Sequence, residues 1–274
     1  MTRVYGRITW FGEYLMHEST EGLVSPSLLY VSDEPNDPLH PWYSPARDSI
    51  RLVVEREGYS AADCVRGTLP LSFGLAGSTA LAMLHLASTA ASERRRMLHI
   101  LDHRTHGFVP SGVDVESIAR QRPGFYSAAG WRDVDWIPPS YALVGFQQES
   151  ERDLISIRSL LLAKRPRLHR LAQEISSVLS NRQLFFAAMF DYCSELYDLG
   201  IYSRNVRLFV AQMLERGLPA KGIGGLYDKA VLVLNLEEDR ALAPRVADLS
   251  EIAWTWPSIL ERSVHLTQIR GEHA

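Results

Sequence analysis

The chain of 274 residues has few cysteines and no excess of basic charge. Its two cysteines, Cys64 and Cys193, are too few for a disulfide framework, which favours a reducing compartment. The net charge of −3 argues against the basic field typical of nucleic-acid binding. The first residues also lack the apolar region of a secretory signal. We therefore expect a cytoplasmic protein that binds no nucleic acid.

Charged residues are also missing from Gly67 to Ser92. This run is long enough for a membrane-spanning helix to be considered. This run contains Pro70, glycines, His85 and many hydroxyl side chains, and only its second half has a helical pattern. A buried helix after a glycine-containing loop explains these features better than a span does. We expect no membrane association.

Apolar patterns predict a mixture of strands and helices. Runs of β-branched, aromatic and other apolar residues predict strands at residues 3–11, 23–31, 50–55, 141–146 and 230–236. Helical spacing of apolar residues predicts helices after residue 80 and near residues 94–101, 115–120, 168–179, 184–197 and 203–214. Residues 131–139 show neither pattern and are expected to be irregular. Because strands and helices do not alternate strictly, the order favours an α+β fold.

A loop of small residues, Pro70 to Ala80, leads into the apolar helical pattern of Leu81, Leu84 and His85. Small residues let a backbone approach a ligand closely. The first amides of a helix are unpaired donors at the positive end of its dipole. Together these features predict a phosphate cradle. The loop matches neither a Walker motif nor a dinucleotide fingerprint, so packing against a neighbouring element is the alternative from the loop alone.

Four segments occur in an order that resembles the GHMP kinases, the family of galactokinase, homoserine kinase, mevalonate kinase and phosphomevalonate kinase. They are residues 6–28, the loop at 70–80, the run His106-Gly107-Phe108-Val109-Pro110-Ser111-Gly112-Val113-Asp114, and residues 220–236. The third segment is most similar to the His-Gly-x-Pro-Ser-Gly-x-Asp run of mevalonate kinase, with one extra residue. The resemblance spans Gly6 to about Leu236.

This resemblance implies a two-lobed α+β fold. An N-terminal α/β lobe, residues 1–139, would carry the phosphate loop, and residues 140–274 would form a ferredoxin-like C-terminal lobe. The implied activity is transfer of the γ-phosphoryl group of Mg-ATP to a hydroxyl of a small metabolite, either a sugar or a mevalonate-like hydroxy acid. The expected cofactors are ATP and Mg²⁺. The alternative is a catalytically degenerate GHMP-fold protein that binds a nucleotide or metabolite and regulates a partner.

The resemblance also implies roles for individual residues. Asp114 falls on the family's active-site aspartate, which faces the acceptor hydroxyl, and Arg7 falls on the cation beside it. Ser78 and Asp102 fall on the two Mg²⁺ ligands. The expected phosphate cradle comprises Gly74, Leu75, Ala76, Gly77, Ser78 and Thr79. Substrate contacts are expected from Glu13, Tyr14, His17, Ser111 and Gly224.

The phosphate loop departs from the family pattern at three residues. Ser72 and Ala76 replace glycines, and Gly77 replaces the first serine. The side chains remain small, so a cradle can form, but with less backbone freedom. The missing glycines, together with the partial glycine pattern near residue 224, motivate the non-catalytic alternative.

Two further features have alternative interpretations. Tyr126, which follows Pro123-Gly124, either lines the acceptor pocket or packs in the core. A histidine-rich segment has the spacing of a zinc cluster on a helix, but lacks the His-Glu-x-x-His order; it comprises His99, Asp102, His103 and His106.

Overall fold

The computed structural model describes residues 2–12, 16, 20–37, 45–62, 65–69, 74–106, 111–146, 154–223 and 230–234. The chain divides into two compact units, one of Met1–Trp10 and Met16–Asp135 and the other of Phe11–Leu15 and Trp136–Ala274. Within the described residues, helices combine with antiparallel strand pairs. This confirms the α+β class.

The first unit is built on a sheet with the strand order β1-β2-β4-β5, and the short strand β3 pairs with β2. Strands β1 (Arg3–Phe11) and β2 (Gly22–Ser32) form where the sequence predicts them. Their apolar side chains enter the core, and the buried indole of Trp10 donates a hydrogen bond of 2.9 Å to the hydroxyl of Ser25. Strands β3 (Arg66–Gly67) and β4 (Gly124–Ser127) both run antiparallel to β2.

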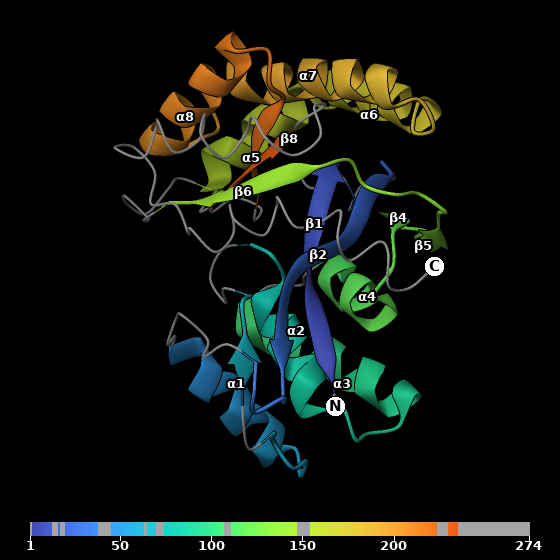
Figure 1. The fold of residues 1–274 in the computed structure, drawn as a ribbon, viewed down its shortest axis with the longest axis vertical. Helices are drawn as coiled ribbons and strands as arrows, with labels where there is room; N and C mark the ends of the chain where they lie inside the picture. The colour runs from blue at the N-terminus through green and yellow to red at the C-terminus, as the bar shows by residue number, and fades with distance from the viewer. Residues whose placement is uncertain are drawn as a thin grey trace. The chain divides into compact units, whose positions relative to one another are not determined.

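Four helices accompany this sheet: α1 (Pro45–Arg56), α2 (Gly77–His85), α3 (Ala91–His106) and α4 (Val113–Arg120). Helix α2 contacts α1, α3, α4 and β2, so it occupies the centre of the unit (Figure 1). Most of its residues are buried, which explains why the sequence around it carries no charge. Within the described part of the chain, none of the helices has the length and apolar character needed to cross a membrane.

The prediction of a strand at residues 50–55 is wrong, because these residues belong to helix α1. Ile50 and Val54 are buried while Leu52 between them is 52% exposed, which is helical rather than alternating periodicity. Arg51 and Glu55 form an ion pair of 2.9 Å at the i,i+4 spacing of a helix. These contacts override the β preference of the β-branched residues in this segment.

The irregular segment predicted at residues 131–139 is partly wrong. Strand β5 (Gly130–Asp133) pairs antiparallel with β4 through a two-residue turn. Gly124 of β4 lies directly under the Trp131 ring, and a Cβ atom at this glycine would overlap the indole. The sequence does not reveal the hairpin because three of the four β5 residues are exposed or half-buried polar residues or glycine.

The second unit contains a three-stranded antiparallel sheet of order β6-β8-β7, built from Tyr141–Gly145, Ala230–Leu234 and Ala220–Ile223. Helices α7 (Arg182–Asp198) and α8 (Arg204–Glu215) pack on one another and on β7 (Figure 1). They confirm the predicted helices, as does α6 (Arg165–Ser177). Helix α5 (Leu154–Ala163) is not predicted, because apolar residues line most of it without a polar face.

Candidate functional site

The small-residue loop, predicted from the sequence to hold phosphate, enters α2 through two residues with left-handed backbone. Gly74 has φ of +72°, and Ala76, immediately before the helix, has φ 56° and ψ 34°. Glycine adopts this conformation freely, whereas alanine is strained there by about 1–2 kcal/mol. Ala76 therefore keeps the backbone shape of a glycine at a position where the family pattern has one. The earlier loop residues 70–73 lie outside the described residues.

We expect Ala76→Gly to raise the free energy of unfolding by about 0.5–1 kcal/mol. Relief of the left-handed strain outweighs the greater chain entropy that glycine has in the unfolded state. Chemical denaturation of the variant and the wild type measures the difference. A matched change at a helical alanine, Ala82→Gly, should instead lower stability by about 1 kcal/mol. A loss of stability in Ala76→Gly would contradict the strain at this position.

Strand β1 contacts the loop backbone directly. The amide of Arg7 donates a hydrogen bond of 2.8 Å to the carbonyl oxygen of Leu75. At Gly6, a Cβ atom would lie 2.8 Å from the same oxygen and would overlap the Leu69 side chain. Only glycine allows this approach, so β1 fixes the position of the loop where it turns into α2.

The guanidinium of Arg7 pairs with the carboxylate of Asp114 in the first turn of α4. The Nη2 to Oδ1 distance is 2.7 Å, and the two side chains are only 10% and 20% exposed. Arg7 Nη1 donates to the hydroxyl of Thr9, whereas its buried Nε has no hydrogen-bond partner among the described residues. Because burial strengthens the attraction of opposite charges, this pair holds β1 and α4 together. The unused donor leaves the guanidinium one further bond for a ligand.

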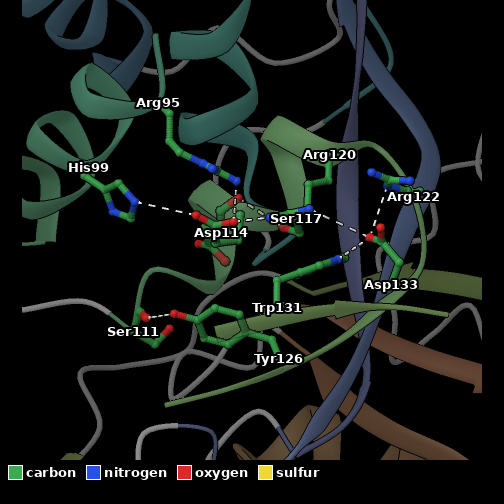
Figure 2. Close-up of polar contacts among 11 residues, drawn as sticks. Arg95, His99, Ser111, Asp114, Ser117, Arg120, Arg122, Tyr126, Trp131 and Asp133 are labelled. Carbon is green, nitrogen blue, oxygen red and sulfur yellow. Dashed lines mark hydrogen bonds and ion pairs between the residues drawn. The ribbon is translucent and has the colours of Figure 1, made fainter. Parts of the chain in front are cut away.

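Tyr126 on β4 lies beside the start of α4. Its hydroxyl donates to the carbonyl oxygen of Ser111, and Figure 2 shows the ring directed toward that residue. Burial raises the pKa of the Tyr126 phenol, and the carboxylates of Glu116, Asp102 and Asp114 raise that pKa further. Asp102 from α3 and Asp114 from α4 therefore both lie close enough to Tyr126 for their charges to act on its phenol.

The raised pKa of Tyr126 predicts a pH-dependent contribution to stability. The folded state keeps the neutral phenol, so the contribution is complete below pH 10 and is lost as the pH rises through the raised folded pKa. The stability difference between wild type and Tyr126→Phe should thus be constant near neutral pH and shrink above pH 10. Denaturation at pH 7 to 11 measures it. A difference that does not change with pH would contradict the raised pKa.

A network of ion pairs fixes α4 against its neighbours. Glu116 accepts from Arg95 of α3 at 2.7 Å and from Arg120 at 3.2 Å, and His99 Nε2 lies 3.8 Å from its other oxygen. Asp133 of β5 lies 3.9 Å from Arg120 in the last turn of α4 and pairs with Arg122 at 3.1 Å, as Figure 2 shows. The helix that carries Asp114 is thereby tied to α3 and to the β4-β5 hairpin.

The structure brings together several residues that the sequence predicts, namely Arg7, Asp114 and the Leu75 backbone. Ser78 lies in the first turn of α2, and the buried Asp102 lies in α3, which packs against α2. The remaining predicted substrate residues lie outside the described residues: Glu13, Tyr14, His17 and Gly224.

The structure offers no support for zinc where it describes side chains. Within that part of the chain, no three His, Cys, Asp or Glu residues are grouped to hold a metal ion. Two members of the histidine-rich segment, His103 and His106, have side chains outside the description.

Sequence reasoning missed one residue that contacts β1 near the site. Gln121 ends α4, and its side chain bonds to the backbone of Tyr5. No local pattern marks this residue, because Gln121 and Tyr5 lie 116 positions apart in the chain.

Comparison with known proteins identifies the fold. No protein-family model and no curated protein sequence matches this chain. Among solved structures, L. major mevalonate kinase in complex with R-mevalonate superposes with a TM-score of 0.66 at 16% identity, covering 90% of this chain and 89% of that one.

Two other kinases match comparably. Streptococcus pneumoniae phosphomevalonate kinase gives a TM-score of 0.58 at 15% identity, over 92% of this chain and 94% of that one. Lactococcus lactis galactokinase complexed with galactose gives 0.60 at 10% identity, over 98% and 90%. The chain therefore has a GHMP kinase-like fold, as the resemblance of its motifs predicts.

Proposed function

We propose that this protein is a GHMP-type kinase that transfers the γ-phosphoryl group of Mg-ATP to a hydroxyl of a small metabolite. The observation that carries the proposal is the Arg7–Asp114 pair, a mostly buried ion pair beside the end of the phosphate loop. Phosphoryl transfer depends mainly on positioning and charge neutralisation, which such a pair provides. A regulator without catalysis would not need Arg7 and Asp114 together with Ser78 and Asp102.

The residues around α2 fit a bound Mg-triphosphate. The first turn of α2 has no acidic residue to repel phosphate, and Gly74 and Ala76 just before it have small side chains. Ser78 and Asp102 supply a hydroxyl and a carboxylate, the hard oxygen ligands that Mg²⁺ prefers. When bound, Mg-ATP supplies the phosphoryl group, and its metal neutralises phosphate charge. The backbone of Gly74 to Thr79 would hold the phosphates.

The chain's own groups act on the acceptor. Asp114 would orient the acceptor hydroxyl and receive its proton, or hold the hydroxyl by charge while the proton leaves with the product. Arg7 would lower the pKa of that hydroxyl and stabilise the negative charge that develops in transfer. Its unused Nε donor is available to the same charge.

The acceptor would be recognised by the residues to which the family resemblance assigns this role. The proposed contacts come from Glu13, Tyr14, His17, Ser111 and Gly224. A sugar and a mevalonate-like hydroxy acid are both consistent with the fold, because the matched kinases include one in complex with R-mevalonate and one with galactose.

A thermal-shift titration with Mg-ATP, followed by a transfer assay on hydroxylated metabolites, tests this function. We expect saturable stabilisation by Mg-ATP and turnover with at least one sugar or hydroxy acid. Binding without turnover on any acceptor would favour the regulatory alternative. Failure to bind any nucleotide would contradict both.

A further inference from the structure

The side chain of Gln121 occupies the free edge of strand β1. Among the described strands, β1 lies at the end of its sheet and pairs only with β2. Gln121 Oε1 accepts from the amide of Tyr5 at 2.9 Å, and its Nε2 donates to the carbonyl oxygen of the same residue at 3.1 Å. One side-chain amide thus imitates the backbone of a neighbouring strand.

The backbone at Gln121 is strained, which indicates that its side chain is required there. Its φ is +52°, a left-handed conformation that favours glycine or asparagine at the end of a helix. Asparagine is one methylene shorter than glutamine. Three hydrogen bonds offset the strain, since Nε2 also donates to the carbonyl oxygen of Ile118 at 2.9 Å.

Two parts of the proposed site use the same edge of β1. At Tyr5 the edge binds Gln121 at the end of α4, and at Arg7, two residues on, it binds the carbonyl of Leu75 from the phosphate loop. Residues two apart in a strand direct their amides to the same side. The backbone of β1 therefore fixes the positions of both the loop before α2 and the end of α4. Asp114 shares α4 with Gln121 and pairs with Arg7.

We propose that Gln121 is a positioning residue, which sets the place of Asp114 relative to Arg7 and the phosphate loop. This role rests on the proposed kinase function. Both ends of α4 are then fixed: Tyr126 holds the carbonyl of Ser111 just before it, and Gln121 binds β1 just after it. A shift of about 1 Å in a reacting group can slow catalysis about 100-fold, so the anchor controls rate rather than nucleotide affinity.

The test uses Gln121→Gly, which removes the side-chain amide and also the left-handed strain, so the variant keeps a melting temperature near that of wild type. We expect kcat to fall about 10- to 100-fold while KM for Mg-ATP stays within about twofold. The control Asn181→Ala loses a helix-capping bond in the second unit and should leave kcat unchanged. A kcat loss no larger than in this control, or a KM that rises in step, would overturn the proposal.

A second measurement needs no activity, so it separates this proposal from the kinase function. Asp114→Asn should lower the melting temperature by fewer degrees in the Gln121→Gly background than in wild type, because the anchor and the ion pair join the same two elements. Equal decreases in both backgrounds would overturn the positioning role. Absence of turnover in wild type would instead overturn the proposed function, and the coupling would still decide the role of Gln121.

Discussion

Asp114→Asn is expected to lower kcat about 10²- to 10⁴-fold, the range for loss of a positioned acid-base group. The amide cannot take a proton from the acceptor and cannot balance the charge of Arg7, from which Asp114 Oδ1 is 2.7 Å distant. KM for Mg-ATP should change little, because the phosphate loop does not depend on this carboxylate. Steady-state kinetics with the best acceptor of the panel measures both constants.

Asp37→Asn is the matched control for this change. Asp37 is also an ion-paired carboxylate of the first unit, but it contacts Arg3 of β1 at 2.6 Å rather than a residue of α4. We expect wild-type kcat from this variant. The replacement Arg7→Met should reproduce the loss seen in Asp114→Asn, since it removes the other half of the pair. Wild-type kcat in Asp114→Asn would exclude Asp114 from the chemistry.

Gly6→Ala is expected to abolish detectable binding of Mg-ATP and to lower the free energy of unfolding by about 1–3 kcal/mol. The added methyl would lie 2.8 Å from the Leu75 carbonyl oxygen and overlap the Leu69 side chain. The loop would have to leave β1, with loss of the Arg7–Leu75 backbone hydrogen bond. Thermal-shift and calorimetric titrations with Mg-ATP measure the effect.

Gly58→Ala serves as the control for Gly6→Ala. A Cβ atom at Gly58 meets nothing within 4 Å, but φ is +85°, so alanine is strained there. This variant should lose about 1 kcal/mol of stability and keep its nucleotide affinity. Equal affinities of the Gly6→Ala and wild-type proteins for Mg-ATP would show that the contact between β1 and the loop does not shape the cradle.

The sequence predicts the elements whose burial is one-sided or complete. Strands β1 and β2 and helices α2, α6, α7 and α8 follow from apolar periodicity, because their core faces are apolar over several turns or pleats. Helix α1 was mistaken for a strand because Val53 and Val54 are β-branched, and only tertiary burial of Ile50 and Val54 decides its period. The β4-β5 hairpin is missed because only Trp131 among the residues of β5 is apolar, so the strand has no alternating pattern.

In the candidate site too, the sequence predicts the residues that belong to local motifs and misses those that only tertiary contacts bring together. The small-residue loop and the Ser-Gly-x-Asp run are local patterns, so the sequence proposes Arg7, Ser78 and Asp114 by their place in motifs. The hydrogen bonds of Gln121 to Tyr5 join residues 116 positions apart, and no local pattern reports such a distance. The raised pKa of Tyr126 similarly depends on carboxylates from two helices that only the fold brings together.

³¹P NMR of the complete reaction detects phosphoryl transfer to a small-molecule hydroxyl without a coupled assay. The protein is incubated with Mg-ATP and one acceptor at a time from a set of sugars and hydroxy acids. We predict that ADP and a phosphomonoester of the acceptor appear in equal amounts, and that Asp114→Asn forms neither at a comparable rate. Absence of a phosphomonoester with every acceptor, or its formation at the same rate by Asp114→Asn, would contradict the account.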